Sequence, residues 1–314
     1  MITPAAFRRG LILIVLAAVL WGTTGLTSRM LYRLSAVDAL SIGFLRLLIA
    51  APAMLLIGHA LAPGSLGPMA RRDWRAVALF GLGVAGYNYC FFAAVARTSV
   101  TAATLLALCT APLFVALLAR LLLAEPLTRP VVLALAAGLT GTILLVGSQG
   151  GHDLLRRDAL AGNLLAIGAA LSYAGVALVG RAKSQQAAPG SFVALAFAAG
   201  LIFLAPVALS RRLSLPTTGP AWLAMLYLSL VPTALAYLIY IFGLRTVPAT
   251  TSTIGTLVEP LTAALLAALF LGERLPPSGL VGAGLLLSSL AILSLGDLAR
   301  RRRRPFRQRA PTPG

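Results

Sequence analysis

The chain has 314 residues, of which 59% are hydrophobic and only 11% are charged, and its mean hydropathy is +0.92. A water-soluble domain needs roughly a quarter of its residues charged, so this composition excludes a soluble fold. The net charge of +18 does not indicate nucleic-acid binding, because the basic residues lie in short gaps between apolar runs and in a cluster from Arg300 to Arg309. Such basic clusters attract the anionic head groups of a lipid bilayer.

Ten apolar runs follow one another along the chain, each about long enough to cross the hydrocarbon layer of a membrane as a helix. Charged residues, Gly or Pro bound them, and the gaps are too short to hold an extramembrane domain. The sequence therefore predicts an all-α polytopic membrane protein with ten transmembrane helices. The predicted spans cover residues 11–31, 38–58, 76–96, 100–120, 130–147, 160–180, 191–209, 221–243, 248–271 and 279–296.

The first span follows Arg8 and Arg9, and further spans succeed it without a clear small-residue cleavage site. We therefore expect a retained helix rather than a signal peptide. With both termini in the cytoplasm, the cytoplasmic gaps and the tail receive the greater share of the 26 Lys and Arg residues. The positive-inside rule then predicts a multi-pass protein of the bacterial inner membrane with both termini cytoplasmic. The pattern predicts no particular oligomeric state, and a monomer is compatible with it.

The second half of the chain repeats the first. At an offset of 148 residues, Arg97–Leu127 aligns with Arg245–Leu275 without a gap, and 12 of the 31 positions are identical. A weaker match at an offset of 152 places Trp21 over Tyr173. Leu and Ala often match by chance in such an apolar chain, so the evidence for the repeat comes from matches between rarer residues. These matches are Arg97 with Arg245, Pro112 with Pro260, Tyr89 with Tyr237, Glu125 with Glu273 and, at the offset of 152, Arg29 with Arg181.

The repeat predicts the domain organisation: a five-helix half over 1–147, a linker loop over 148–159, a second half over 160–296 and a basic cytoplasmic tail over 297–314. Because five is odd, the second half must enter the membrane from the opposite side. Inverted repeats of this kind are common in transporters, where exchanging the conformations of the halves exposes a central site to either side. The alternative is a duplication kept for packing, in a membrane scaffold subunit that moves no solute.

Short motifs in both halves resemble the EamA family of the drug/metabolite transporter superfamily. Ala111–Leu118 followed by Leu123–Glu125 forms the first copy of the signature. Glu259–Ala264 followed by Leu271–Glu273 forms a fuller second copy. The resemblance extends over essentially the whole chain and is specific for the family rather than for a substrate.

The first two spans also look like that family, in Trp21-Gly22 and Phe44-Leu45-Arg46. The resemblance implies a ten-helix fold around a central cavity lined mainly by the first, third, fourth, sixth, eighth and ninth spans. It also implies a small-molecule substrate, and the family includes amino-acid exporters of the YddG type. Proton-coupled export of drugs or quaternary amines is the alternative. The four-helix multidrug relatives carry a glutamate in their first span, where this chain has no acidic residue and has Trp21, Thr23 and Thr24 among its polar groups.

Polar side chains inside the spans are the candidate substrate-binding residues, because such groups are costly in hydrocarbon and are usually functional. Glu259 lies midway along the ninth span, and helical spacing places Ser252 and Thr256 on the same face. Pro260 follows, removes one backbone hydrogen bond and favours a kink. A polar face beside a kink is suited to line a cavity, and we expect Glu259 to contact substrate or to titrate during transport. The alternative is a neutral, protonated Glu259 that hydrogen-bonds a neighbouring helix.

Aromatic rings with neighbouring hydroxyl or amide groups complete the predicted binding site. A cavity lined in this way suits an amphipathic small molecule such as an apolar amino acid. Rings at these positions can equally pack between helices or lie at the membrane interface. The predicted residues outside the ninth span are Trp21, Thr24, Asn88, Tyr89, Thr104, Tyr173, Tyr237 and Tyr240.

A second group of residues is expected to be structural. Arg46 lies inside the second span, where its guanidinium could neutralise a substrate carboxylate or pair with an acid of the protein, and we favour a structural role. Pro112 and Pro260 are the predicted bends, while Glu125 and Glu273 end their spans and are expected to cap the next helix. The histidines are isolated and no catalytic motif occurs, so we expect no metal site, no cofactor and no enzyme activity.

Overall fold

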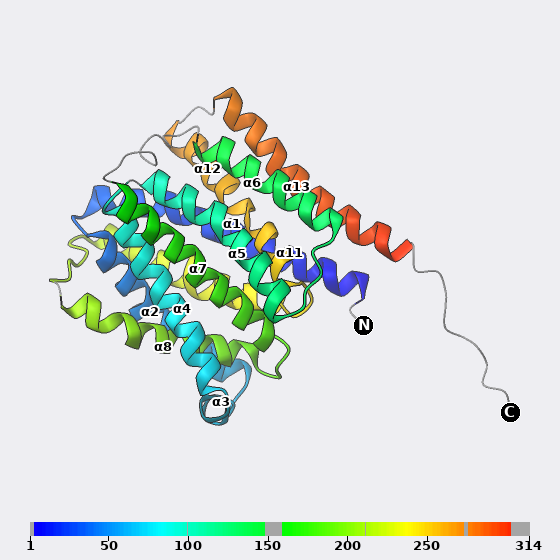
Figure 1. The fold of residues 1–314 in the computed structure, drawn as a ribbon. Coiled ribbons are helices and arrows are strands. Elements are labelled where there is room, and N and C mark those ends of the chain that lie inside the picture. The colour runs from blue at the N-terminus through cyan, green and yellow to red at the C-terminus, as the bar shows by residue number, and fades with distance from the viewer. Residues whose placement is uncertain (1–2, 99, 148–158, 211, 273–275, 303–314) are drawn as a thin grey trace.

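The structure is a computed structural model that describes residues 3–98, 100–147, 159–210, 212–272 and 276–302. These residues form helices joined by short connections, and no β-strand occurs among them (Figure 1). Ten helical stretches in this part of the chain are long and apolar enough to cross a membrane. The predicted all-α fold with ten transmembrane helices is thus confirmed.

The helices follow the predicted spans closely. In chain order they are α1 (Pro4–Leu34), α2 (Ala39–Leu61), α3 (Leu66–Arg72), α4 (Trp74–Val95), α5 (Val100–Leu122), α6 (Arg129–Gly147), α7 (Leu160–Lys183), α8 (Pro189–Leu209), α9 (Gly219–Ser229), the π-helical turn η3 (Leu230–Leu235), α10 (Ala236–Gly243), α11 (Ala249–Thr256), α12 (Val258–Leu271) and α13 (Pro277–Arg302).

The structure adds detail that the apolar runs do not contain. α1 begins at Pro4, seven residues before the predicted span, because the Thr3 hydroxyl accepts a hydrogen bond from the Ala6 amide and caps the helix. The eighth span contains the π-helical turn η3, and the ninth is interrupted at Leu257 between α11 and α12. Pro260 lacks the N–H that would bond the carbonyl of Thr256, which accounts for this interruption. α5, in contrast, continues through Pro112.

The spans of one half pack mainly against spans of the other half. α1 contacts the eighth span (α9, η3 and α10) and the ninth (α11 and α12), while α7 contacts the third and fourth spans, α4 and α5. α2 packs against α8, and α6 packs against α13 along one edge of the bundle (Figure 1). The same pairings therefore recur when the two halves are exchanged, and both halves contribute equivalent walls to one bundle.

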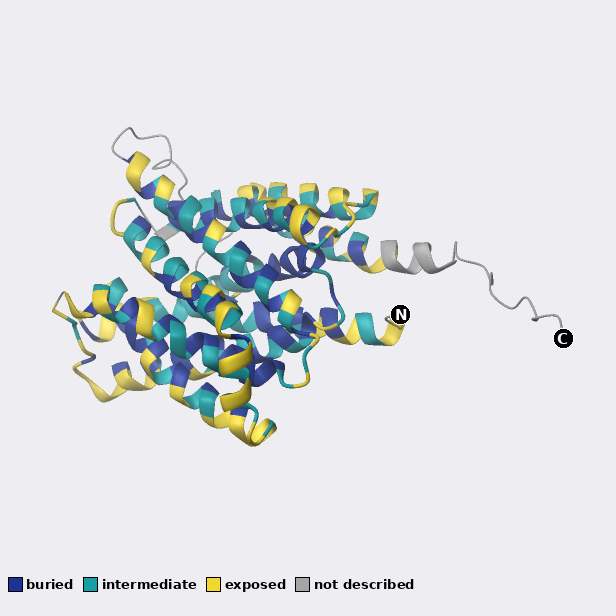
Figure 2. Cartoon of the chain, turned by 60° about the horizontal axis from the view of Figure 1, so that its bottom comes forward, coloured by how far each residue is buried: buried dark blue, intermediate teal, exposed yellow. Residues whose placement is uncertain are grey.

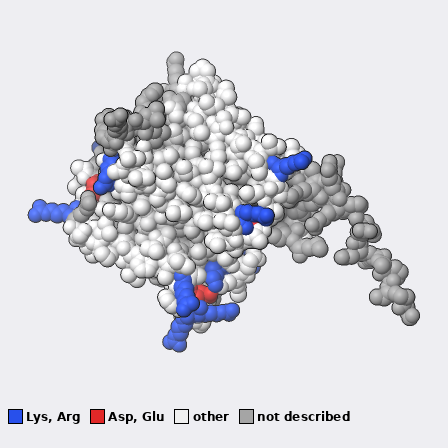
Figure 3. All heavy atoms as spheres, in the orientation of Figure 1, with Lys and Arg blue, Asp and Glu red and all other residues white. Residues whose placement is uncertain are grey.

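The outer surface of the bundle is apolar. Buried residues face the interior, and exposed residues lie on outward helix faces (Figure 2), among them Leu56 and Leu269 at 73% and 69% exposure. A broad face carries no charge, and Lys and Arg gather at its margins (Figure 3). The start of α1 and the end of α13 lie at the same end of the bundle (Figure 1). This surface is that of a multi-pass membrane protein with lipid around its middle.

Candidate functional site

A cavity of about 390 Å³ lies between the two halves, within the size range of small-molecule sites. Its wall comes from α1, α4, α5, α7, α10 and α12, which belong to the six spans that the family resemblance implies, and α2 and α6 each add one residue. It includes the later part of α1, up to Tyr32, but only the first part of α5, up to Leu108. The cavity therefore extends from the middle of the bundle toward the end where α1 finishes.

Most of the predicted substrate-binding residues lie on the wall of this central cavity. They are Trp21, Thr24, Asn88, Thr104, Tyr173, Tyr237 and Glu259. Arg46 and Pro260, which we expected to be structural, line it as well. The role of these residues in substrate binding stays a prediction, but they come from seven spans that are distant in sequence and line one cavity.

Three predicted residues lie behind the wall instead. Tyr240 is 1% exposed, and its hydroxyl lies 3.3 Å from the hydroxyl of Ser252. The Ser252 hydroxyl also donates to the carbonyl of Ala249, and the Thr256 hydroxyl donates to the carbonyl of Thr253. Because the helix is interrupted at Leu257, the stripe predicted from helical spacing does not continue as one cavity-lining face. The contact between Tyr240 and Ser252 joins α10 to α11 behind the cavity wall.

Tyr89 points away from the central cavity. It is 37% exposed and lies on the wall of a second cavity, of about 650 Å³, with Asp38 and Arg212. Its neighbour Asn88 is buried, lines the central cavity and donates a hydrogen bond to the carbonyl of Val84. Adjacent residues of α4 thus line different cavities, because neighbouring side chains of a helix point in different directions.

Aromatic rings form one corner of the central cavity. The Trp21 ring lies 5.0 Å from that of Tyr237, between ring centres, and Tyr87 stacks on Phe91 at 5.7 Å. Trp21 is 8% exposed, and its indole N–H has no hydrogen-bond partner in the described part of the chain. Sequence reasoning left Tyr87 and Phe91 out, although their spacing of four residues beside Asn88 places all three close together on α4.

Close packing of α1 on α12 brings Trp21 and Glu259 to the same cavity. A Cβ atom on Gly22 would lie 2.6 Å from Thr262 and 2.8 Å from the carbonyl oxygen of Glu259, so only glycine fits there. Small residues at helix contacts allow this close approach in membranes. The structure thus gives a physical reason for the glycine of the Trp21-Gly22 motif.

Two ionisable groups of opposite charge face the cavity. The Arg46 guanidinium donates to the hydroxyl of Thr233 from Nε at 3.1 Å and from Nη2 at 2.9 Å. The Thr233 hydroxyl in turn donates to the carbonyl of Leu228, five residues earlier, across the start of η3. Glu259 and Arg46 form no ion pair with each other, and no residue in the described ranges hydrogen-bonds the Glu259 carboxylate. Their charges interact only at longer range.

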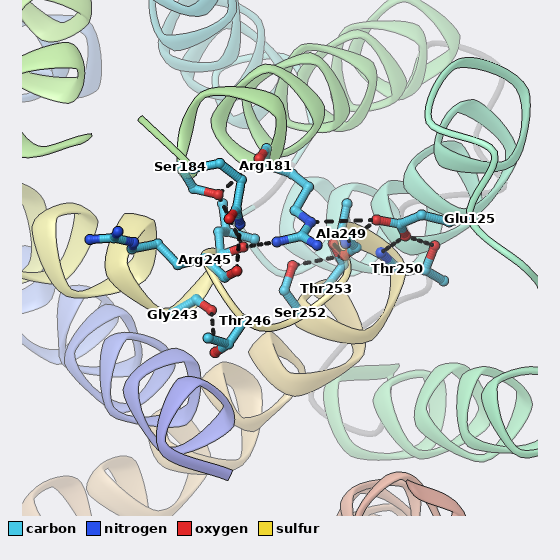
Figure 4. Close-up of polar contacts among 12 residues, drawn as sticks. Glu125, Arg181, Ser184, Gly243, Arg245, Thr246, Ala249, Thr250, Ser252 and Thr253 are labelled. Carbon is cyan, nitrogen blue, oxygen red and sulfur yellow. Dashed lines mark hydrogen bonds and ion pairs between the residues drawn. The ribbon is translucent and has the colours of Figure 1, made fainter. Parts of the chain in front are cut away.

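A polar cluster of Glu125, Arg181, Ala249 and Thr250 joins helices at the other end of the bundle (Figure 4). The Glu125 carboxylate accepts hydrogen bonds from the amides of Ala249 and Thr250 at 2.8 and 3.1 Å, and from the Thr250 hydroxyl at 3.1 Å. Arg181 Nε lies 3.9 Å from the same carboxylate, and Arg181 also donates to the carbonyl of Leu244. A carboxylate at a helix N-terminus satisfies free backbone amides of the helix, and the partial positive charge of that terminus stabilises the carboxylate. α5, α7, α10 and α11 are therefore tied together here.

This placement corrects one expectation. Glu125 caps α11, which begins the ninth span, rather than the next helix α6. Sequence adjacency suggested α6, but the turn after α5 directs the carboxylate across the bundle to the other half. Glu273, the matching residue of the second half, lies outside the described residues.

The model of the EamA-like transporter family matches this chain twice, over residues 8–147 and 160–295. The chain belongs to the EamA family. It is 33% identical over 281 residues to the "uncharacterized transporter YwfM" of Bacillus subtilis (strain 168), covering 90% of this chain and 92% of that protein. It is 29% identical over 266 residues to a "probable terminal-alkyne amino-acid exporter" of Streptantibioticus cattleyicolor, covering 82% and 84%.

A solved crystal structure has the same fold, with a TM-score of 0.81 over 94% of this chain and 99% of that one, at 22% sequence identity. At this identity the likeness shows the fold alone. Together with the ten candidate spans, the family membership makes this protein a membrane transporter of small molecules. The central cavity of this EamA protein is thus the candidate substrate site.

Proposed function

We propose that this EamA transporter exports amino acids or similar small metabolites across the bacterial inner membrane by alternating access. The central cavity carries the proposal, because it combines an aromatic corner with two opposite charges, Arg46 and Glu259. Amphipathic molecules of modest size match a cavity of about 390 Å³ lined in this way. The name of one relative, a probable amino-acid exporter, supports the same substrate class.

Alternating access follows from two halves that cross the membrane in opposite senses, as five spans per half require. The recurrence of the same helix pairings after exchange of the halves supports this arrangement. In the structure, the Glu125 cluster ties one end of the bundle while the cavity extends toward the other end. Breaking this cluster and closing the opposite end would expose the cavity to the other side. With both termini cytoplasmic, the tied end is the cytoplasmic one.

One observation favours a second candidate, a proton-coupled exporter of drugs or quaternary amines. Glu259 is a carboxylate in the cavity without a hydrogen-bond partner in the described ranges, and such a group can bind a cation or a proton. Efflux of amino acids from liposomes that contain the purified full-length protein distinguishes an amino-acid facilitator from a proton-coupled exporter. An amino-acid facilitator retains flux after collapse of the proton gradient, whereas a proton antiporter stops. A scaffold subunit shows no flux of any solute.

The cavity assignment is tested by Glu259→Gln, Tyr237→Ala and Trp21→Ala in the same liposomes. We expect each variant to insert and fold. Its amino-acid flux should fall about tenfold or more, because each substitution removes a contact that contributes about 1.4 kcal/mol or more. Leu269→Ala, on the 69% exposed outer surface, is the control and should transport normally. Normal flux in all three cavity variants would show that substrate passes elsewhere.

A further inference from the structure

We propose that Arg46 and Glu259 recognise the two charges of a zwitterionic α-amino acid, with Arg46 binding the carboxylate and Glu259 the ammonium group. The inference rests on the proposed function, because it takes the central cavity as the transport site. It gives Arg46 a ligand-binding role in place of the structural role favoured from the sequence. The carbon side chain of the amino acid then lies against the aromatic corner.

The hydrogen bonds of Arg46 leave one edge of its guanidinium available. Thr233 occupies the edge formed by Nε and Nη2, and it is a neutral partner. No acid of the described residues forms an ion pair with Arg46. A guanidinium cannot shed its charge, and its planar N–H fork matches a carboxylate with two parallel hydrogen bonds. The edge formed by Nη1 and Nη2 therefore fits a ligand carboxylate.

Thr233 holds the guanidinium in place through the backbone. Its hydroxyl donates to the carbonyl of Leu228 at 2.7 Å, so its lone pairs are directed toward Arg46. This geometry depends on η3, because an ordinary α-helical turn pairs residues four apart rather than five. π-Helical turns are frequent at functional sites, and this one orients an arginine at the cavity wall.

Glu259 supplies the opposite charge in the same cavity. Its carboxylate faces the cavity and accepts no hydrogen bond from the described part of the protein. Arg46 and Glu259 line the same cavity without an ion pair between them, so one ligand that carries both charges can contact both residues. A cation alone would leave Arg46 uncompensated, and an anion alone would leave Glu259 uncompensated. A single ligand that compensates both charges is a zwitterion, and an unpaired buried charge is costly.

The rest of the wall sets the side-chain preference. Trp21, Tyr87 and Tyr237 line the same cavity as the two charges, and Phe91 with Ala263 adds to its apolar wall. Such a surface favours a large apolar or aromatic side chain. The unpartnered indole N–H of Trp21 adds one further donor close to this corner.

Two matched ligand series test the inference on the purified full-length protein in lipid nanodiscs, with binding measured by calorimetry. The first is L-phenylalanine, L-phenylalaninamide and 3-phenylpropionate, and the second is L-leucine, L-leucinamide and 4-methylpentanoate. Each series keeps the side chain and removes either the carboxylate or the ammonium group. We expect the amino acid of at least one series to bind about tenfold or more tightly than both of its analogues.

The variants assign each charge to a residue. Arg46→Gln should abolish the preference for the amino acid over the amide, and Glu259→Gln the preference over the carboxylate analogue. If Arg46→Gln does not fold, Thr233→Val serves instead, because it removes the hydroxyl that orients the guanidinium. Arg46→Lys is the charge-conserving control and should retain part of the preference.

The outcomes separate this inference from the proposed function. If liposomes transport amino acids but the wild type binds amide, carboxylate analogue and amino acid equally, the charge assignment is wrong and the proposed function stands. Equal weakening of all three ligands by Arg46→Gln would also overturn the assignment. Absence of both binding and flux for every amino acid overturns the inference and the proposed function together.

Discussion

Asp73 shows how one side chain outside the membrane-spanning segments fastens the two halves together. It precedes α4, and its Oδ1 accepts a hydrogen bond from Nζ of Lys183, at the end of α7, at 2.5 Å. Gln186 Nε2 donates to Oδ2 at 3.1 Å. The hydrogen bond from the Lys183 ammonium lowers the pKa of the Asp73 carboxyl below its usual range, and burial opposes this only in part. The ionised carboxylate is therefore the form that the fold stabilises.

The stability of the protein should depend on the charge of Asp73. Because the pKa is lower in the folded state, the contribution is fully present above the ordinary value of 3.8 and is lost as the pH falls through the folded value below it. Asp73→Asn should cost about 1 kcal/mol at neutral pH. Melting of the detergent-solubilised protein at pH 7 and at about pH 3 checks this. An equal difference between wild type and variant at both pH values would contradict it.

At the scale of elements, the turn after α5 decides what closes one end of the bundle. Ala124 adopts a φ of 52°, in the left-handed region, and the Glu125 amide donates to the carbonyl of Ala119 at 3.1 Å. Gly272 holds the matching position after α12 with a φ of 67°. A non-glycine residue in this region carries a small strain, which the hydrogen bonds of Glu125 with α11 offset. The turn thereby delivers a carboxylate to the opposite half.

Glu125→Gln should loosen the tied end, because a neutral amide replaces a carboxylate that accepts three hydrogen bonds. In a Cys90→Ala, Cys109→Ala background, a cysteine replacing the 1% exposed Thr253 reports on opening. A membrane-impermeant maleimide added from the side of the membrane that holds the Glu125 cluster should label it about tenfold faster in Glu125→Gln.

The control for this labelling is Arg245→Gln. Arg245 lies at the same end, and its side chain points away from the Glu125 cluster (Figure 4). The Arg245→Gln substitution removes a charge without removing a contact of the Glu125 cluster, so the labelling rate should not change. Equal labelling of wild type and Glu125→Gln would show that the cluster does not restrict access.

At the scale of the whole molecule, the seam between α6 and α13 joins the two halves along one edge of the bundle (Figure 1). The backbones approach closely there. A Cβ atom on Gly282 would lie 2.6 Å from the carbonyl oxygen of Gly141 and 2.7 Å from the amide nitrogen of Leu145. Close backbone packing of this kind replaces the hydrophobic driving force, which lipid does not supply between helices.

Gly282→Ile should separate α6 from α13 and destabilise the protein by about 1–3 kcal/mol, the usual cost of overpacking. Gly284 provides a matched control on the same helix, because a Cβ atom there meets nothing within 4 Å. Gly284→Ile should melt close to the wild type, and Gly282→Ile several degrees lower, in the same detergent. Identical melting of the two variants would contradict the close seam.

The course of the chain through the membrane could be read from the sequence. Length and hydropathy are local properties, and a helix must satisfy its own backbone hydrogen bonds in lipid, so ten apolar runs imply ten helices. The motifs around Pro112 and Pro260 indicated the family, and most predicted polar residues reached the central cavity. The apolar runs and the motifs depend on neighbours within a few turns of one helix.

Only the tertiary structure decided which of these side chains share the cavity and what they contact. Tyr237 lines the wall whereas Tyr240, one turn later, is buried behind it, because packing against the other half selects the face. Arg46 meets Thr233 across 187 residues, through a π-helical turn that no local pattern predicted. Glu125 reaches α11 across 124 residues in the same way. Contacts between the halves depend on how two bundles fit together, and the hydropathy of either one does not contain that information.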